Sequence, residues 1–290
     1  MKKILTVLMS LGLLVACSSN HYSSISDGDE VIFTKADGTS YSKQSLYEDM
    51  KSNDIADTLK VGLINKLAEY EGIDMEEIEN EVSETVDAMV TAGYDQFIIT
   101  YYGSVSNYKN STIANQALTK LCENEVTNNF DQYVSDYEPY KAEIVYFDTK
   151  EAAQAVLDAV ANEENTFEYA CTENGYTSEV SETLYTDSDS DLPVDVKDYV
   201  LNTETTGLSD VIEVSTTTTD SDGNSTVTPR YYIVNLISKN AEDFKDEFIS
   251  TIAEKVDQET LINSLLEKYN IEVHDQSVYE ALKDTYGAVK

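Results

Sequence analysis

Two polar residues stand in the two most strand-like stretches of the chain, and they are the first candidates for chemistry. Glu143 lies in the run Ala142–Phe147, and Tyr232 lies in the run Tyr231–Ile237. If the two strands pair, a carboxylate and a phenol could share a hydrogen bond across them. The alternative is that both are ordinary residues of adjacent strands with no catalytic role.

The sequence lacks other motifs that carry chemistry. It has no Gly-x-Ser-x-Gly nucleophile elbow, no phosphate-binding P-loop and no His-Glu-x-x-His zinc motif. Its two histidines, His21 and His274, lie outside the stretch from Tyr140 to Ser238. With 55 acidic residues, pairs of carboxylates arise by chance, so no paired-carboxylate mechanism is inferred. We therefore expect neither a metal ion nor a cofactor.

Helical patterns flank this central stretch on both sides. On the N-terminal side, apolar residues recur at steps of three or four, and a long helix is predicted over roughly Asn107–Tyr137. On the C-terminal side, one apolar stripe from Phe244 to Tyr269 predicts a single helix of about seven turns. Such a helix cannot bury its own face, so we expect it to pack on the N-terminal helices. The central stretch is predicted to be a small α+β domain carried by this helical scaffold.

The charge balance excludes some partners. The chain has 55 acidic and 19 basic side chains, a formal net charge of −36. Because it has no basic patch to displace counterions from phosphates, nucleic-acid binding is not expected. Charge would not hold it on an anionic membrane either. The acidic surface could serve only solubility, or it could attract basic clients or bind cations loosely.

The N-terminus predicts export. Lys2 and Lys3 precede a short apolar run, Ile4–Leu14, which ends in Leu14-Val15-Ala16-Cys17. Small residues before a Cys at this place resemble the lipobox of bacterial lipoproteins. That resemblance implies removal of residues 1–16 and a lipid such as palmitate on Cys17, with the chain on the extracytoplasmic face of the cell membrane. The alternative is an ordinary secretory signal with an incidental Cys.

Cys122 and Cys171 are the other two cysteines. They form no Cys-x-x-Cys motif and have no histidine nearby. An exported protein could join them in a disulfide, or both could be small buried apolar residues. The sequence leaves both alternatives open.

Several segments, in this order, resemble the PrsA-type extracytoplasmic foldases and their SurA-type relatives. They are the lipobox, the turn and helix of Asp37–Tyr47, Phe97–Gly103 before a long helix, and Phe244–Tyr269 before Ile271-Glu272-Val273. The resemblance implies an α+β fold. A helical SurA-like chaperone domain is built from the N- and C-terminal segments, and a parvulin-like α+β domain lies between them.

The domain organisation implied by this resemblance runs the length of the chain. Residues 1–16 are the lipoprotein signal peptide, 17–30 a tether, and 31–139 the N-terminal part of the chaperone domain. Residues 140–239 are the parvulin-like domain, 240–275 the helix that completes the chaperone domain, and 276–290 a tail.

The chain departs from the parvulin pattern where the active site should lie. Parvulin-type prolyl isomerases carry His-Ile-Leu in their first strand and His-Ile-Ile in their last. This chain has Glu143-Ile144-Val145 and Tyr232-Ile233-Val234 there. Cys171 falls near a position that some parvulins fill with Cys or Ser. The resemblance thus makes Glu143, Cys171 and Tyr232 the candidate catalytic residues. Since both histidines are replaced, we expect weak or absent isomerase activity.

The sequence thus predicts a lipid-anchored foldase or chaperone that binds unfolded exported proteins and could form a homodimer. Its Tyr residues, 21 in all, could partly line the client-binding surface. One alternative is an active peptidyl-prolyl cis-trans isomerase with a rearranged site. Another is an envelope-binding lipoprotein without chaperone activity.

Overall fold

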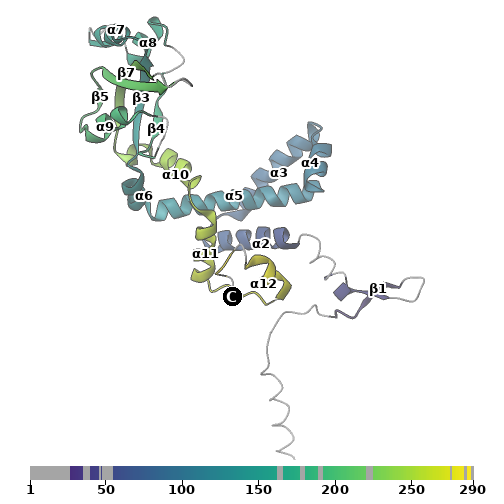
Figure 1. Ribbon diagram of the computed structural model, residues 1–290. Coiled ribbons are helices and arrows are strands. Elements are labelled where there is room, and N and C mark those ends of the chain that lie inside the picture. Colours follow the sequence, from purple (N-terminus) through teal and green to yellow (C-terminus); the bar gives the residue numbers. More distant parts are fainter. Residues whose placement is uncertain are drawn as a thin grey trace, which may run out of the picture. The chain divides into compact units, whose positions relative to one another are not determined.

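The computed structural model describes residues 27–34, 40–45, 47, 55–161, 166–176, 180–188, 192–219, 225–274, 276–283 and 286–288. The signal peptide, Cys17 and most of the tether lie outside these residues, and their assignments stay predictions. The chain divides into two compact units, which are described separately. Unit 1 consists of Met1–Cys122 and Val256–Lys290, and unit 2 of Glu123–Lys255 (Figure 1).

Unit 1 is helical. Its helices are α2 (Ile55–Tyr70), α3 (Met75–Thr91), α4 (Asp95–Tyr102), α5 (Val105–Asn128, which ends in unit 2), α11 (Gln258–Lys268) and α12 (Gln276–Leu282). Both C-terminal helices contact α2. The core therefore joins the two ends of the chain, and its fully buried members include Leu67, Val82, Ile98, Leu121, Ile262 and Leu266. The predicted helical part built from N- and C-terminal segments is confirmed.

Polar groups fix the start of α3 and the packing of α11 on α2. Asp74 accepts a hydrogen bond from the Glu77 backbone N–H at 3.1 Å, which satisfies one of the donors at the start of α3. The Tyr269 hydroxyl, just past α11, donates to Glu71 Oε1 at 2.9 Å and to the Tyr70 carbonyl at 3.0 Å. These bonds tie the end of α11 to the end of α2.

A small two-stranded sheet precedes the helices of unit 1. Strands β1 (Val31–Thr34) and β2 (Ser40–Ser42) pair antiparallel. The rings of Phe33 and Tyr41 stack across the pair, with centroids 4.7 Å apart.

Unit 2 is built on an antiparallel sheet. Its strands are β3 (Tyr140–Phe147), β4 (Thr183–Tyr185), β5 (Gly207–Leu208), β6 (Ile212–Thr219) and β7 (Ser225–Ser238). The order is β4-β3-β7-β5, and β6 also pairs with β7. The helices of this unit are α6 (Phe130–Tyr137), α7 (Lys150–Ala161), α8 (Phe167–Glu173), α9 (Val194–Asn202), the 3-10 turn η1 (Ala241–Phe244) and α10 (Lys245–Ala253).

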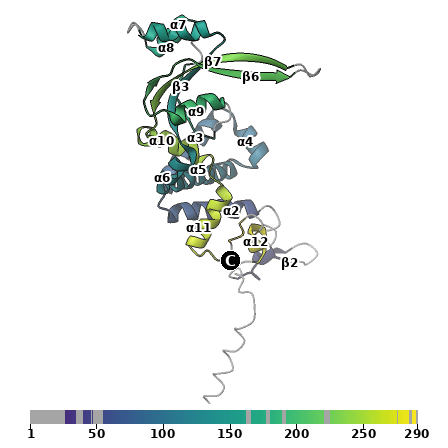
Figure 2. The same cartoon turned by 60° about the vertical axis from the view of Figure 1, so that its left-hand side comes forward.

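Helices cover both faces of this sheet (Figure 2). Side chains alternate between the faces along each strand. Val145, Phe147 and Ile233 pack with residues of α7 and α8 on one face. Val234 and Leu236 pack with residues of α9 on the other. Together with the helices of unit 1, this confirms the predicted α+β class.

Two predicted helices are each divided in the structure, and the prediction of continuous helices was wrong. The stripe Phe244–Tyr269 forms η1, α10 and, after a break, α11, with α10 in unit 2 and α11 in unit 1. The break has a local cause. The Asp257 side chain accepts the N–H groups of Glu259 and Thr260 at 3.1 Å and starts a new helix. The long helix predicted near Asn107–Tyr137 likewise ends at Asn128 and resumes at Phe130.

Candidate functional site

Glu143 lies on β3 on the face of the sheet that carries α7 and α8. Its strand partner is Asn235, and the Asn235 Nδ2 amide donates to Glu143 Oε2 at 2.8 Å. The carboxylate is half-buried and therefore only partly hydrated. The Asn235 amide supplies a hydrogen bond that water does not fully provide there. Glu143 is thus engaged in a cross-strand pair within the sheet.

Tyr232 lies on the opposite face. Its strand partner on β3 is Tyr146, and the two ring centroids lie 6.2 Å apart with a tilt of 45°. The Arg230 guanidinium lies 5.0 Å from the Tyr146 ring centroid. Residues at an odd spacing along paired strands face opposite ways. The predicted hydrogen bond between Glu143 and Tyr232 is therefore wrong, because the sheet itself separates the two side chains.

Cys171 is fully buried on α8, in the cluster that contains Val145, Phe147 and Ile233. It shares a face with Glu143 and is separated from Tyr232 by the sheet. The structure therefore does not gather the three candidate catalytic residues into one site. A catalytic role for any of them stays a prediction.

Cys122 is also buried, and it lies in unit 1, whereas Cys171 lies in unit 2. Both are thiols rather than partners in a disulfide. This agrees with the alternative of two small buried apolar residues. Among the described residues, no group of three or more His, Cys, Asp or Glu is placed to hold a metal ion.

A second candidate site lies on helix α4, where aromatic side chains are exposed. We call it the α4 aromatic patch, and it consists of Tyr94, Phe97 and Tyr101, whose spacing of three and four residues places them on one side of the helix. The Phe97 side chain is 56% exposed and that of Tyr101 70%, and their ring centroids lie 4.6 Å apart. Large rings are normally buried in a protein of this size, so a cluster of exposed rings suggests a binding surface.

Local sequence explains why these rings face solvent. Phe97 and Tyr101 are four residues apart and share one side of the helix. Ile98 points the other way and is 1% exposed, so it anchors α4 to unit 1. Gly103, with φ at 75°, then ends the helix in a conformation that favours glycine. One buried side chain thus holds a helix whose other apolar residues remain exposed.

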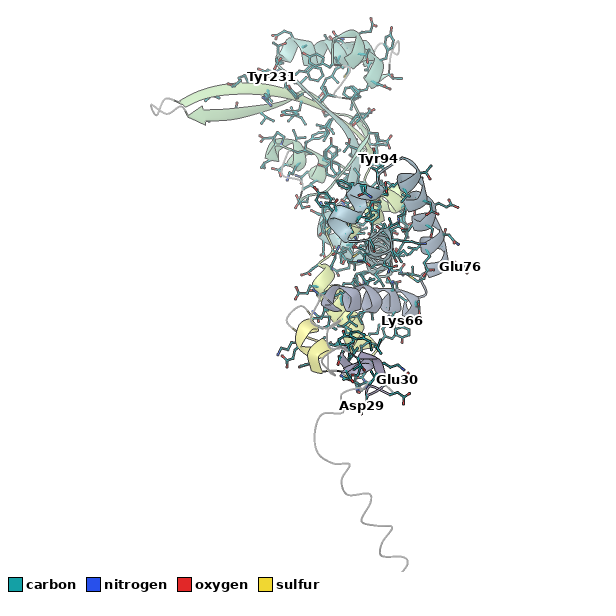
Figure 3. All side chains as sticks on the ribbon, turned by 90° about the vertical axis from the view of Figure 1, so that its right-hand side faces the viewer. Asp29, Glu30, Lys66, Glu76, Tyr94 and Tyr231 are labelled. Carbon is teal, nitrogen blue, oxygen red and sulfur yellow. The ribbon has the colours of Figure 1, made fainter. Side chains whose placement is uncertain are left out.

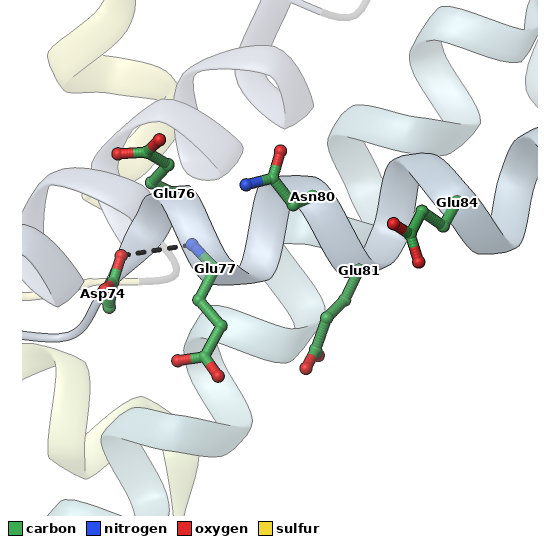
Figure 4. A pocket seen from close by; sticks show the side chains of 6 residues that line it. All are labelled: Asp74, Glu76, Glu77, Asn80, Glu81 and Glu84. Atoms are coloured by element: carbon green, nitrogen blue, oxygen red, sulfur yellow. Dashed lines mark hydrogen bonds between the residues drawn. The ribbon is translucent and has the colours of Figure 1, made fainter.

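The chain around the patch is acidic. No Lys or Arg occurs between Lys66 and Lys109, whereas Asp and Glu recur throughout α3. Carboxylates line a shallow depression of about 370 Å³ along α3, formed by Asp74, Glu76, Glu77, Asn80, Glu81 and Glu84 (Figure 4). Figure 3 labels Glu76 on α3 and Tyr94 just before α4. The aromatic patch therefore lies in a stretch of the chain that carries only negative charge.

Comparison with known proteins identifies foldases as structural neighbours. The chain matches no protein-family model and no curated protein. Among solved structures it is similar to the foldase protein PrsA from Streptococcus pneumoniae, with 20% identity over 88% of this chain and 99% of that chain and a TM-score of 0.44. PrsA from Lactococcus lactis is 17% identical over 89% and 98%, with a TM-score of 0.44. The peptidylprolyl isomerase PrsA from Bacillus cereus is 19% identical over 90% and 99%, with a TM-score of 0.39.

Two further observations concern the membrane and the patch. Of the helices that the structure describes, none combines the length and the apolar character needed to cross a bilayer. In the sequence, Phe97–Gly103 stood out only as one of the segments that resemble the PrsA-type foldases and not as a site. The available signal was the pair of aromatic residues four positions apart on a helix with one apolar residue on its other side.

Proposed function

We propose that this chain is an extracytoplasmic foldase that holds non-native exported polypeptides, and that the α4 aromatic patch is its main contact with them. The observation that carries this proposal is the exposure of clustered rings on a helix that a single buried residue anchors. Apolar segments of an unfolded chain are the partners that such a surface would cover.

The energy available is of a suitable size for transient holding. Covering roughly 100 Å² of a half-exposed ring contributes about 2 to 3 kcal/mol at about 25 cal/mol per Å². The entropy lost in ordering a client would offset most of the contribution of two or three rings covered together, which leaves weak and reversible binding. A holding chaperone needs such binding because it must release its client for folding.

The negative field around the patch supports a preference for cationic clients. Lys and Arg side chains are attracted by the carboxylates of α3 and can lie over exposed Tyr and Phe rings. A client segment that alternates apolar and basic residues would satisfy both. Acidic segments would be repelled.

The lipid anchor on Cys17 and the position on the outer face of the cell membrane belong to this proposal. They are supported by Lys2, Lys3, the apolar run Ile4–Leu14 and the small residues before the Cys. Two acyl chains would hold the protein stably at the surface without help from charge. Mass spectrometry of the membrane-extracted protein tests this directly, since an unmodified Cys17 in the mature chain would contradict it.

Prolyl isomerase activity is proposed to be weak or absent. Glu143 is hydrogen-bonded to Asn235, Cys171 is buried, and Tyr232 lies on the other face from both. An active isomerase with a rearranged site is the alternative. The exposed Tyr146 ring under Arg230, beside Tyr232, is the observation that favours it.

The decisive experiment is suppression of aggregation of a reduced, unfolded client by the soluble chain from Ser18 onward. The Phe97→Ser/Tyr101→Ser double variant should need at least fivefold more protein for the same protection. Tyr169→Ser is the matched control, because Tyr169 is an exposed ring on α8 in unit 2. Equal protection by native and double-variant protein would contradict the proposal. Cis/trans isomerisation of a proline peptide, measured in parallel, decides between weak or absent isomerase activity and an active isomerase with a rearranged site.

A further inference from the structure

Strand β6 has one open edge. It pairs with β7 along one side, and within the described residues no strand pairs with its other side. Figure 2 shows β6 and the first half of β7 running out from the sheet as a two-stranded ribbon. An edge strand presents unpaired N–H and C=O groups, on which another extended chain can be added as a strand. The length of β6, eight residues, is sufficient for such an addition.

The hydrogen bonds of Val234 on β7 show which main-chain groups of β6 face outward. The Val234 carbonyl accepts the Ser209 N–H at 2.8 Å, and the Val234 N–H donates to Ser209 Oγ at 3.0 Å. Both groups thus point to the side of β7 on which β5 and β6 lie. The direction of the backbone N–H and C=O groups alternates residue by residue along a strand. The even-numbered residues of β7 therefore direct these groups toward β6.

The register then assigns the residues of β6. Arg230 and Thr228 of β7 pair with Val214 and Thr216, which therefore turn their N–H and C=O groups inward. The odd-numbered residues of β6 alternate with these and turn their N–H and C=O groups toward the open edge. They are Glu213, Ser215, Thr217 and Thr219. Pro229, the partner of Ser215, fits this pattern, because a proline has no N–H and is tolerated where the nitrogen faces away from the ladder.

The two edges of the ribbon differ in protection. β3 ends at Phe147, opposite Tyr231, so the first half of β7 also lacks a partner on that side among the described residues. Pro229 removes one donor from that edge. β6 contains no Pro and no Lys, and its register with β7 shows no bulge. Its Ile, Val and Thr residues favour extended structure. β6 is thus the unprotected edge.

We propose that the open edge of β6 captures an extended segment of a non-native polypeptide as an added strand, recognised through its main chain. This inference rests on the proposed function and adds a second site that reads no side-chain sequence. Charge argues for a client rather than a second copy of the chain. The only charged residues of the two strands are Glu213 and Arg230, whereas a second copy would bring another formal charge of −36.

The test uses a fluorescent decapeptide of alternating Thr and Val with one Lys at each end, and an analogue N-methylated at every second residue. Binding is measured by anisotropy in the Phe97→Ser/Tyr101→Ser background, so that the α4 aromatic patch does not contribute. Thr217→Pro removes one outward N–H and blocks the approach of a strand. Thr217→Val is the matched control, which keeps the N–H and the β-branched shape. Circular dichroism and thermal midpoints establish that each variant is folded.

We expect the Thr217→Pro variant to bind the peptide at least tenfold more weakly than its parent does. The N-methylated analogue should bind every one of these proteins as weakly as Thr217→Pro binds the unmethylated peptide. Thr217→Val should bind within twofold of its parent. Equal binding by all variants, or an equal loss in Thr217→Val, would overturn main-chain capture. A dimer in sedimentation that Thr217→Pro abolishes would overturn the assignment of a client. Aggregation suppression by the native chain is judged separately, so either proposal can fail alone.

Discussion

Helix α4 and strand β6 expose different parts of the polypeptide to solvent. The α4 aromatic patch exposes rings within an acidic stretch, whereas β6 exposes backbone N–H and C=O groups on a nearly uncharged ribbon. Rings and carboxylates select apolar and cationic side chains, while an open ladder accepts any segment that can extend. Neither surface is a cleft lined by ionisable side chains. Under the two proposals, one chain would combine selective and unselective binding of non-native proteins.

The largest expected effect is the difference in stability between substituting the buried residue of α4 and substituting an exposed one. Ile98→Ala should lower the free energy of unfolding by about 3 kcal/mol, because Ile98 is buried and leaves a cavity. Ile99→Ala is the matched variant, at 41% exposure, and should cost under about 0.5 kcal/mol. Urea unfolding measures both. If both substitutions cost the same, α4 is not held in the way described.

Salt should distinguish the two proposed binding surfaces. Raising ionic strength from about 50 to about 500 mM should weaken binding of a Lys-rich apolar peptide to the α4 aromatic patch roughly fivefold, since screening shortens the reach of the α3 carboxylates. Binding of a Thr-Val segment to the β6 edge should change by less than about twofold, because neutral main-chain hydrogen bonds are screened little. Anisotropy titrations in both buffers test this. An equal salt dependence would remove the distinction.

The candidate catalytic residues provide a test that should give a small effect. Glu143→Gln and Tyr232→Phe should each change any measured prolyl isomerisation by less than about twofold, because the sheet separates the two side chains and no shared network is lost. Protease-coupled or NMR exchange assays with a proline peptide are suitable. A tenfold loss in Tyr232→Phe alone would favour the face of the sheet that carries Tyr146 and Arg230 as a rearranged active site.

The smallest effect concerns the start of α11, where the chain returns to unit 1. The backbone N–H of Thr260, followed by its side chain and then the Glu259 N–H, holds the pKa of Asp257 below its usual value. Because the pKa is lowered, the ionised carboxylate stabilises the fold at pH values above the unfolded pKa near 3.9. This stabilisation is lost as the pH falls through the folded pKa. Native protein should thus lose more thermal stability than Asp257→Asn between pH 6 and pH 3. A parallel decline in both proteins would contradict this role.

Local patterns were sufficient for much of the fold. The runs Ala142–Phe147 and Tyr231–Ile237 lie within β3 and β7, and the apolar periodicity on both sides of them marks helices. Of the two failures, the divided helix has a local cause and the missed helix at the C-terminus has a long-range one. A continuous apolar stripe does not show that Asp257 restarts the helix, and residues 276–290, predicted to be a tail, contain α12, whose packing on α2 no pattern revealed.

Sequence by itself determined most of the segments that form helices and strands here, the α+β class and the acidic character, because periodicity and charge are properties of neighbouring residues. Only the tertiary structure decided that Glu143 and Tyr232 face opposite ways, that Cys171 is enclosed, that the rings of α4 remain uncovered and that β6 has an open edge. Register, burial and strand order depend on contacts between residues far apart in the chain. A period of two or 3.6 does not encode which side of an element will find a partner.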